Sequence, residues 1–354
     1  MKKLTQTIVL LFLVSVVMTA SANQFNVHGG LYDALVEKLK IYDGYMADDK
    51  SQTSPDKNTN IAILFDYSGS DHAQLLIGKQ VGKKWEIHHS STKAVYQKGV
   101  KPSVELISSV NGGFILKYQD EQYEFLPNDQ DQYILTTADI AAVEYNLDKT
   151  AGIYHVKSAD QAIEWRAAPI TLDDFNITLF PKSVNEAQAY NAIYGKLSSL
   201  SFSARNREIL MQHAGSKTTA VYSAPSEQSY RASKGKAAVN LESSLWLLGT
   251  EGDWVLIRYA INNKSERIGY VQSRRFAYLP PDISILDDTE FVNLIGSNDC
   301  YMTLDPINSQ SKEGIVSKGD TIKAYGLYDP FYVYVESSIS GKSARGFVPI
   351  NALQ

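Results

Sequence analysis

The chain repeats the order of its structural signals between Thr218 and Leu353, and this repeat constrains the fold more than any other feature. Each copy has a short β-prone run that leads into a proline, then a glycine-marked turn before an aromatic and aliphatic strand, and finally a Gly-aromatic-Val segment. The corresponding residues are 220–225 with 300–306, 247–257 with 324–335, and 267–271 with 344–348. Runs of this kind at regular spacing are typical of antiparallel β units. Two copies of one small β unit are therefore predicted, over residues 218–280 and 288–354.

The two copies resemble the bacterial SH3-like domain family, a five-stranded small barrel found in exported and cell-wall proteins. In the first copy, residues 252–257 (Gly-Asp-Trp-Val-Leu-Ile) and residues 269–271 (Gly-Tyr-Val) match the recognisable segments of that family. The second copy departs from the pattern, because Pro330-Phe331 stands where the first has Asp253-Trp254, although residues 345–348 (Arg-Gly-Phe-Val) support the assignment. The resemblance implies two small SH3-like barrels and says nothing about residues 23–200.

The resemblance also implies a binding role, because loops between the strands of a small barrel line a shallow groove. It places an aromatic residue, here Trp254 and its match Phe331, at a strand start near that groove, where a flat ring stacks on sugars or peptide side chains. The candidate ligand-binding residues are Trp254, Tyr259, Tyr270, Phe331 and Tyr332. Two alternatives stay open: Trp254 covers the end of the barrel, and the tyrosines are structural. The expected barrel core is Leu247, Val255, Ile257 and Val271.

The first residues have the three parts of a secretory signal peptide. Lys2 and Lys3 give a positive start, an apolar run covers Ile8 to Val17, and Ala20-Ser21-Ala22 follows. The apolar run is shorter than the roughly 20 residues that a membrane-spanning helix requires. Residues 1–22 are therefore expected to be cleaved, which gives an exported protein, periplasmic or extracellular, with no membrane span in the mature chain.

Composition narrows the fold class and the partners. The 22 tyrosines and 12 phenylalanines, against five methionines, favour strands over helices. The formal net charge of −5 becomes −7 when Lys2 and Lys3 are removed with the signal peptide, so nucleic acid is not expected as a partner. Cys300 is the only cysteine, which excludes an intramolecular disulfide. We expect a mainly β protein stabilised by packed cores.

Residues 23–200 are predicted to form an antiparallel β domain of unknown role with flanking helices. Leu31, Ala34, Leu35 and Leu39 share one helical face, which predicts a helix at about 30–41, and a polar loop follows over 48–60. Strands are predicted at 61–66, 73–78, 85–89, 114–119, 122–126, 133–136, 141–145, 153–157, 162–166 and 176–180.

A second helix is predicted after Pro181 and is expected to pack on this domain. Ser183 and Glu186 form a capping box, and a helical stripe follows it. The stripe consists of Tyr190, Ile193, Tyr194 and Leu197. Residues 201–217 are expected to link this helix to the first barrel.

No catalytic site is predicted. All six histidines precede Cys300, which lies on an expected strand, so a papain-like arrangement of cysteine before histidine is missing. His88 and Ser90 would share one face of a strand, but the sequence offers no third member for a triad. The histidines lack zinc-binding spacing, and Asp129-x-Asp131 lacks the glycine and distal glutamate of a calcium loop. No metal site or cofactor is expected.

Three functional hypotheses follow. The first is a non-catalytic binding protein of the bacterial envelope whose ligand is peptidoglycan. The second is an adaptor or inhibitor that docks its acidic chain on an envelope protein. The third is a cell-wall hydrolase whose active site lies within residues 23–200.

Overall fold

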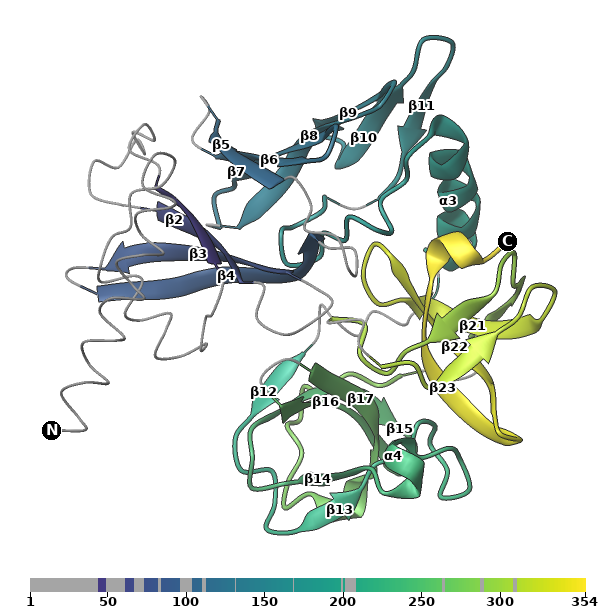
Figure 1. Ribbon diagram of the computed structural model, residues 1–354. Coiled ribbons are helices and arrows are strands. Elements are labelled where there is room, and N and C mark those ends of the chain that lie inside the picture. The colour runs from purple at the N-terminus through teal and green to yellow at the C-terminus, as the bar shows by residue number, and fades with distance from the viewer. Residues whose placement is uncertain are drawn as a thin grey trace, which may run out of the picture. The chain divides into compact units, whose positions relative to one another are not determined.

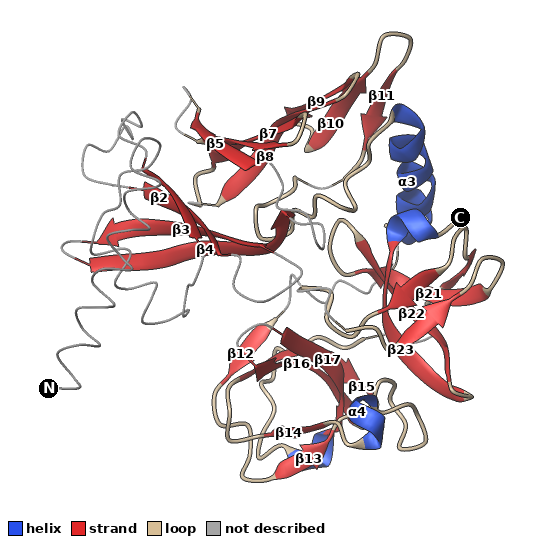
Figure 2. Ribbon diagram, viewed as in Figure 1, coloured by secondary structure: helices blue, strands red, loops and turns tan. Residues whose placement is uncertain are grey.

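The protein is mainly β in the computed structural model, with several antiparallel sheets and few helices, as the composition predicts (Figures 1 and 2). The structure describes residues 44–48, 61–66, 73–81, 84–95, 104–109, 113–130, 132–167, 169–198, 200, 208–262, 265–286, 290–307 and 311–354. The predicted signal peptide and the helix at 30–41 lie outside these residues, and so does the loop predicted at 48–60 except Asp48, which ends a strand. Two compact units are present, one of residues 1–140 with 171–175 and the other of residues 141–170 with 176–354.

The described part of the first unit contains eight antiparallel strands. They are β1 (Gly44–Asp48), β2 (Ile61–Asp66), β3 (Ala73–Val81), β4 (Lys84–Val95), β5 (Val104–Ser108), β6 (Phe114–Tyr118), β7 (Glu121–Pro127) and β8 (Tyr133–Ile140). The hairpin of β6 and β7 is confirmed: Phe114, Leu116 and Tyr118 are buried on one face, and Tyr118 pairs with Glu121. Phe175 packs against the rings of Tyr123 and Phe125 in this unit.

The second unit begins with β9 (Val143–Asp148), β10 (Ile153–Lys157) and β11 (Ala162–Trp165). Strands β9, β10 and β11 follow one another in sequence order in an antiparallel sheet. The strand predicted at 176–180 is wrong. The Asn176 side chain accepts from the backbone N–H and the hydroxyl of Thr178, and the Asn176 carbonyl accepts from Leu179 and Phe180, so this segment turns.

Helix α3 (Val184–Leu197) confirms the predicted helix and its capping residue. The Ser183 hydroxyl accepts from the backbone N–H of Glu186 at 3.2 Å, and the Glu186 carboxylate accepts from the N–H of Lys182 at 2.7 Å. Tyr190 is buried and lies edge-on to the fully buried Trp165 of β11. The helix therefore packs on β11.

Two repeats of the same strand plan complete the second unit (Figure 1). The first has β12 (Ile209–Met211), β13 (Thr218–Ala220), the short α4 (Ala232–Gly235), β14 (Ala238–Asn240), β15 (Leu245–Glu251), β16 (Trp254–Asn262), β17 (Ser265–Gln272) and η2 (Ser273–Arg275). The second has β18 (Val292–Ile295), β19 (Cys300–Met302), β20 (Gly314–Val316), β21 (Thr321–Leu327), β22 (Tyr332–Ile339), β23 (Lys342–Pro349) and η3 (Ile350–Ala352).

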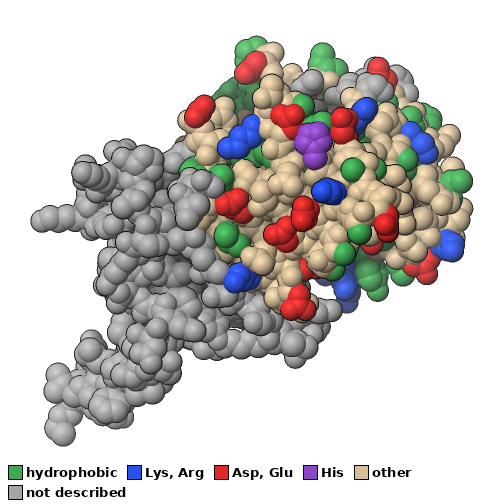
Figure 3. All heavy atoms as spheres, turned by 90° about the horizontal axis from the view of Figure 1, so that it is seen from above, with side chains coloured by type: hydrophobic (Ala, Val, Ile, Leu, Met, Phe, Trp, Pro, Cys, Tyr) green, Lys and Arg blue, Asp and Glu red, His purple; other side chains and the backbone are tan. Residues whose placement is uncertain are grey.

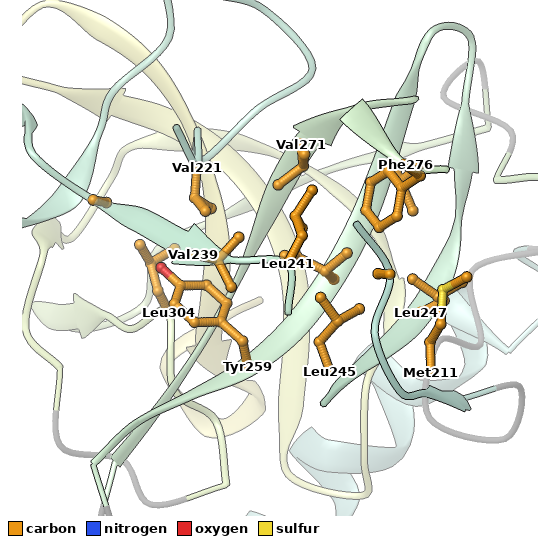
Figure 4. Packing of buried hydrophobic residues seen from close by; sticks show 14 of the residues in the cluster. Met211, Val221, Val239, Leu241, Leu245, Leu247, Tyr259, Val271, Phe276 and Leu304 are labelled. Atoms are coloured by element: carbon orange, nitrogen blue, oxygen red, sulfur yellow. The ribbon is translucent and has the colours of Figure 1, made fainter. Parts of the chain in front are cut away.

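The sheet orders of the repeats correspond strand for strand. Each has a four-stranded sheet, β12-β15-β16-β17 or β18-β21-β22-β23, and a two-stranded sheet, β13-β14 or β19-β20. Strand β12 pairs with β15 although it lies within the segment predicted to be a linker, so the first repeat begins by Ile209. Met211 and Ala214 also belong to the buried cluster of the first repeat, together with Leu247, Val255, Ile257 and Val271, which the sequence predicts as core. Figure 4 shows Met211, Leu247 and Val271 in this cluster.

Two glycines fix the register between the repeats. Gly249 and Gly326 each follow a β-bulge, and Gly249 pairs with Leu256 as Gly326 pairs with Tyr334. In this register Trp254 corresponds to Tyr332, because each of them lies two residues before the partner of the bulge glycine. Trp254 lies opposite Gln272, and Tyr332 lies opposite Pro349. The predicted match of Phe331 with Trp254 is therefore wrong by one residue. The cause is one additional residue between the bulge glycine and the next strand, because Trp254 follows Gly249 by five residues and Tyr332 follows Gly326 by six.

A candidate binding surface on the first repeat

Trp254 lies at the start of β16, directly after the turn at Gly252 and Asp253. Gly252 has a φ of 55°, a conformation that glycine adopts without strain, and this permits the tight turn. The Trp254 ring is partly exposed and meets the ring of Tyr222 edge to face, with the centroids 5.4 Å apart. Tyr222 is also partly exposed. We call these two rings the aromatic pair.

The backbone of Tyr222 is fixed to β17. The Tyr222 N–H donates to the carbonyl of Tyr270 at 2.9 Å, and the Tyr270 N–H donates to the carbonyl of Tyr222 at 2.6 Å. Gly269 permits this approach, because a Cβ at that position would lie 2.8 Å from the Tyr222 carbonyl oxygen and 2.7 Å from Cγ1 of Val221. A side chain at residue 269 would therefore displace the segment that carries Tyr222.

Polar groups border the aromatic pair. The Arg231 guanidinium lies 5.1 Å from the centre of the Tyr222 ring and donates to the Ala237 carbonyl at 2.8 Å. Gln272, opposite Trp254, donates to the Glu227 carboxylate and accepts from Nε of Arg274 at 2.9 Å. The exposed Arg274 also lies 3.6 Å from Glu227. The surface thus combines two aromatic rings with hydrogen-bonding groups of both charges.

The other predicted ligand-binding residues have buried side chains. Tyr270 is fully buried and its hydroxyl donates to Glu251 at 2.8 Å, while Tyr259 lies in the core of the first repeat. Phe331 and Tyr332 are buried in the second repeat. Of the five, Trp254 alone keeps a partly exposed side chain. The sequence does not identify Tyr222 as a partner of Trp254, because only the pairing of Tyr222 with β17 brings them together.

The corresponding position in the second repeat is closed. The glycine there is Gly346, where a Cβ would lie 2.9 Å from the carbonyl oxygen of Thr303, so Thr303 corresponds to Tyr222. Thr303 is buried, and its hydroxyl bonds with Ser311 at 2.7 Å and accepts from the N–H of Asp305 at 2.9 Å. Thr303 and the buried Tyr332 thus replace the partly exposed Tyr222 and Trp254.

Helix α3 contacts the second repeat beside this closed position. The Tyr190 hydroxyl donates to the carbonyl of Pro330 at 2.6 Å, in the turn that precedes Tyr332. In the same turn, Oδ1 of Asp329 accepts from the N–H groups of Phe331 and Tyr332 at 2.8 and 2.7 Å. The turn before β22 is therefore held by its own aspartate and by the helix.

The side chains of His88 and Ser90, which the sequence places on one face of a strand, lie outside the described residues. A β-bulge separates Ile87 from His89 in the pairing of β4 with β3. His89 Nδ1 lies 3.7 Å from Oδ2 of Asp173, and the buried Ser91 hydroxyl donates to the Phe175 carbonyl at 3.5 Å. Neither contact supplies the serine–histidine hydrogen bond that activates a nucleophile.

Cys300 lies on β19 as predicted, and its side chain is partly exposed. Burial, with a smaller contribution from the nearby Asp299 carboxylate, raises the pKa of the Cys300 thiol to about 11. The thiol is therefore protonated at neutral pH, whereas a reactive cysteine requires the thiolate.

Three further observations bear on function. Within the described ranges, no three histidine, cysteine or acidic side chains are grouped so as to hold a metal ion. None of the helices in the described part of the chain combines the length and apolar character that crossing a membrane requires. On the face shown in Figure 3, acidic and basic side chains of the described residues are interspersed.

No family model, curated protein or solved structure matches this chain.

Proposed function

We propose that this protein is an exported, non-catalytic binding protein of the bacterial envelope that binds peptidoglycan through the aromatic pair of its first repeat. The observation that carries the proposal is the partly exposed edge-to-face contact of Tyr222 with Trp254. The signal-peptide pattern of residues 1–22 supports export. The repeats are proposed to be SH3-like barrels, which the repeated strand plan and the segment at 252–257 support.

The chemistry around the aromatic pair suits a polymer made of sugars and short peptides. Aromatic rings offer flat apolar faces for sugar rings. Arg231 and Arg274 offer guanidinium groups for carboxylates, and Glu227 and Gln272 offer acceptors for amino and hydroxyl groups. A small number of placed polar groups around apolar rings is the usual composition of a ligand site.

The test is sedimentation of the mature protein, residues 23–354, with purified insoluble peptidoglycan. Wild-type protein is expected to pellet with the polymer. Trp254→Ala should weaken binding at least tenfold, which corresponds to about 1.4 kcal/mol. Tyr301→Ala is the matched control, because Tyr301 is an aromatic residue of the second repeat that is 52% exposed. It should bind as wild type does.

Two results would count against peptidoglycan. Wild-type protein that stays in the supernatant would exclude the polymer as ligand and favour the adaptor hypothesis, in which the aromatic pair contacts an envelope protein. Equal losses in Trp254→Ala and Tyr301→Ala would place the binding surface elsewhere.

A further inference from the structure

We propose that the two C-terminal repeats form an intramolecular two-fold pair, in which the second repeat supports the first and carries no ligand surface of its own. The pairing follows from the contacts between the repeats, and the single ligand surface rests on the proposed function.

The repeats exchange equivalent backbone hydrogen bonds. The N–H of Ile268, which precedes Gly269, donates to the carbonyl of Leu304 at 2.8 Å. The N–H of Arg345, which precedes Gly346, donates to the carbonyl of Ser223 at 3.2 Å. Ser223 follows Tyr222 as Leu304 follows Thr303, so each repeat gives the other the same donor and the same acceptor. Such reciprocity defines an isologous interface, the kind found between two-fold-related subunits.

Apolar packing crosses the same interface. Leu304 of the second repeat is 3% exposed and belongs to the buried cluster of the first repeat. Figure 4 shows it within the cluster that includes Val239 and Tyr259. Removing the second repeat would therefore open the core of the first to water.

An ion-pair clamp joins the repeats on one side of this interface. Nη1 of Arg345 donates to both carboxylate oxygens of Glu251, at 2.9 and 2.8 Å, and Nε donates to Glu336 at 2.9 Å. The hydroxyl of Tyr270 in the first repeat donates to Glu251 at 2.8 Å and accepts from the hydroxyl of Tyr334 in the second at 3.1 Å. Arg345 thus bridges a carboxylate of each repeat.

A second clamp between the repeats has Glu208 at its centre. Glu208, just before β12, accepts from Nη2 of Arg258 in the first repeat at 2.7 Å and from the hydroxyl of Tyr328 in the second at 3.3 Å. Glu208 is not the equivalent of Arg345, whose position corresponds to Ile268, but each of the two residues bridges the repeats.

The bridged positions are equivalent under the strand register. Glu251 and Tyr328 each follow the bulge glycine by two residues, and Arg258 and Glu336 each follow the partner of that glycine by two. The Arg345 clamp therefore joins Glu251 of the first repeat to Glu336 of the second. The Glu208 clamp joins Tyr328 of the second repeat, which is equivalent to Glu251, to Arg258 of the first repeat, which is equivalent to Glu336. Two contacts that exchange equivalent positions are what a two-fold relationship requires.

The pair presents one open surface. Tyr222 and Trp254 are partly exposed in the first repeat, whereas Thr303 and Tyr332 at the equivalent positions are buried in the second. Tandem binding modules commonly gain avidity by engaging two ligands at once. This chain instead uses its second copy as a support.

Hydrogen exchange on the intact mature protein tests the pairing. Phe331→Ala opens a cavity in the core of the second repeat, where Phe331 is fully buried. If the repeats unfold together, protection of amides in both β16 and β22 should fall by a similar factor, on the order of 100-fold. Ile315→Ala, at a side chain of the same repeat that is 57% exposed, should change neither strand. Loss of protection in β22 alone would overturn the pairing. Val348→Ala, a smaller change in the same core, replaces Phe331→Ala if that variant does not fold.

Peptidoglycan sedimentation tests the single surface. Trp254→Ala should remove all specific binding and leave the exchange pattern of β22 unchanged. Residual binding of about half the wild-type amount at saturation would show a second surface and overturn this part of the inference. Wild-type protein that does not sediment would reject the proposed function and the single ligand surface together, and hydrogen exchange would still decide the pairing by itself.

Discussion

Arg345 and Glu251, which are 94 residues apart in the sequence, form a buried ion pair in which one nitrogen of the guanidinium donates to both carboxylate oxygens. Their side chains are 7% and 8% exposed. Burial alone would lower the pKa of Arg345, but the neighbouring Tyr334, Tyr270 and Glu251 raise it, so the guanidinium stays charged. The guanidinium also lies over the ring of Tyr325, 4.3 Å from its centre.

Removing one partner of this pair should destabilise the second unit strongly. Arg345→Met leaves Glu251 buried without its cation, which typically costs about 3–5 kcal/mol. The expected result is a lower midpoint of urea unfolding, followed by circular dichroism. In Arg345→Met with Glu251→Leu, two apolar side chains replace the pair, and the double variant should recover most of the loss. A single variant as stable as wild type would show that the pair contributes nothing.

Acid should weaken the same network through Glu336. Burial by itself would raise the pKa of Glu336, but the hydrogen bond and charge of Arg345, with Tyr325 and Lys323, lower it below the ordinary value of 4.5. A carboxyl with a lowered pKa stabilises the fold above its unfolded-state pKa, and this contribution is lost as the pH falls below about 4.5.

Urea unfolding as a function of pH checks this expectation. Glu336→Gln should be less stable than wild type at pH 7 and should lose less stability on acidification. Glu290→Gln is the control, because Glu290 is exposed. An unchanged pH profile in Glu336→Gln would contradict the assignment.

Alkali should ionise the buried tyrosines of the network only when the protein unfolds. Burial, with the Glu336 and Glu251 carboxylates, raises the pKa of Tyr325 from 10.0 to about 12, although Arg345 acts in the opposite direction. A neutral group with a raised pKa stabilises the fold below its unfolded-state pKa, so this contribution is lost as the pH rises from 10.0 to about 12. Tyrosinate absorbance should therefore rise together with the loss of circular dichroism. Full ionisation of all tyrosines with the fold intact would disprove this.

Two glycine substitutions should change stability in opposite directions. Gly269→Ala places a methyl group 2.7 Å from Val221 and 2.8 Å from the Tyr222 carbonyl, so it should destabilise the fold and weaken ligand binding by moving Tyr222. Gly195→Ala lies within α3, where nothing is within 4 Å of the added carbon, and should stabilise by about 0.5–1 kcal/mol. Thermal unfolding of both variants checks the signs. Tolerance of alanine at 269 would mean that β17 and the Tyr222 segment are not in close contact.

The sequence by itself determined the local elements. Ser183 and Glu186 fix the start of α3, because a cap depends on side chains within one helical turn. The alternation of Phe114, Leu116 and Tyr118 determines the buried face of the β6–β7 hairpin for the same local reason. The strand predicted at 176–180 failed because the Asn176 side chain offers its own hydrogen bonds to the nearby backbone.

Only the tertiary structure decided what lies buried between the repeats and what stays open. In the sequence, Arg345 is a charged residue close to the C-terminus, and its neighbours do not indicate that it will form an ion pair with Glu251. The contact between the Tyr222 and Trp254 rings, and the burial of Thr303 and Tyr332, likewise depend on strands that are far apart in the sequence. Local periodicity encodes which face of a strand is apolar, whereas the partner of a buried charge or an exposed ring is set by packing between segments distant in the chain.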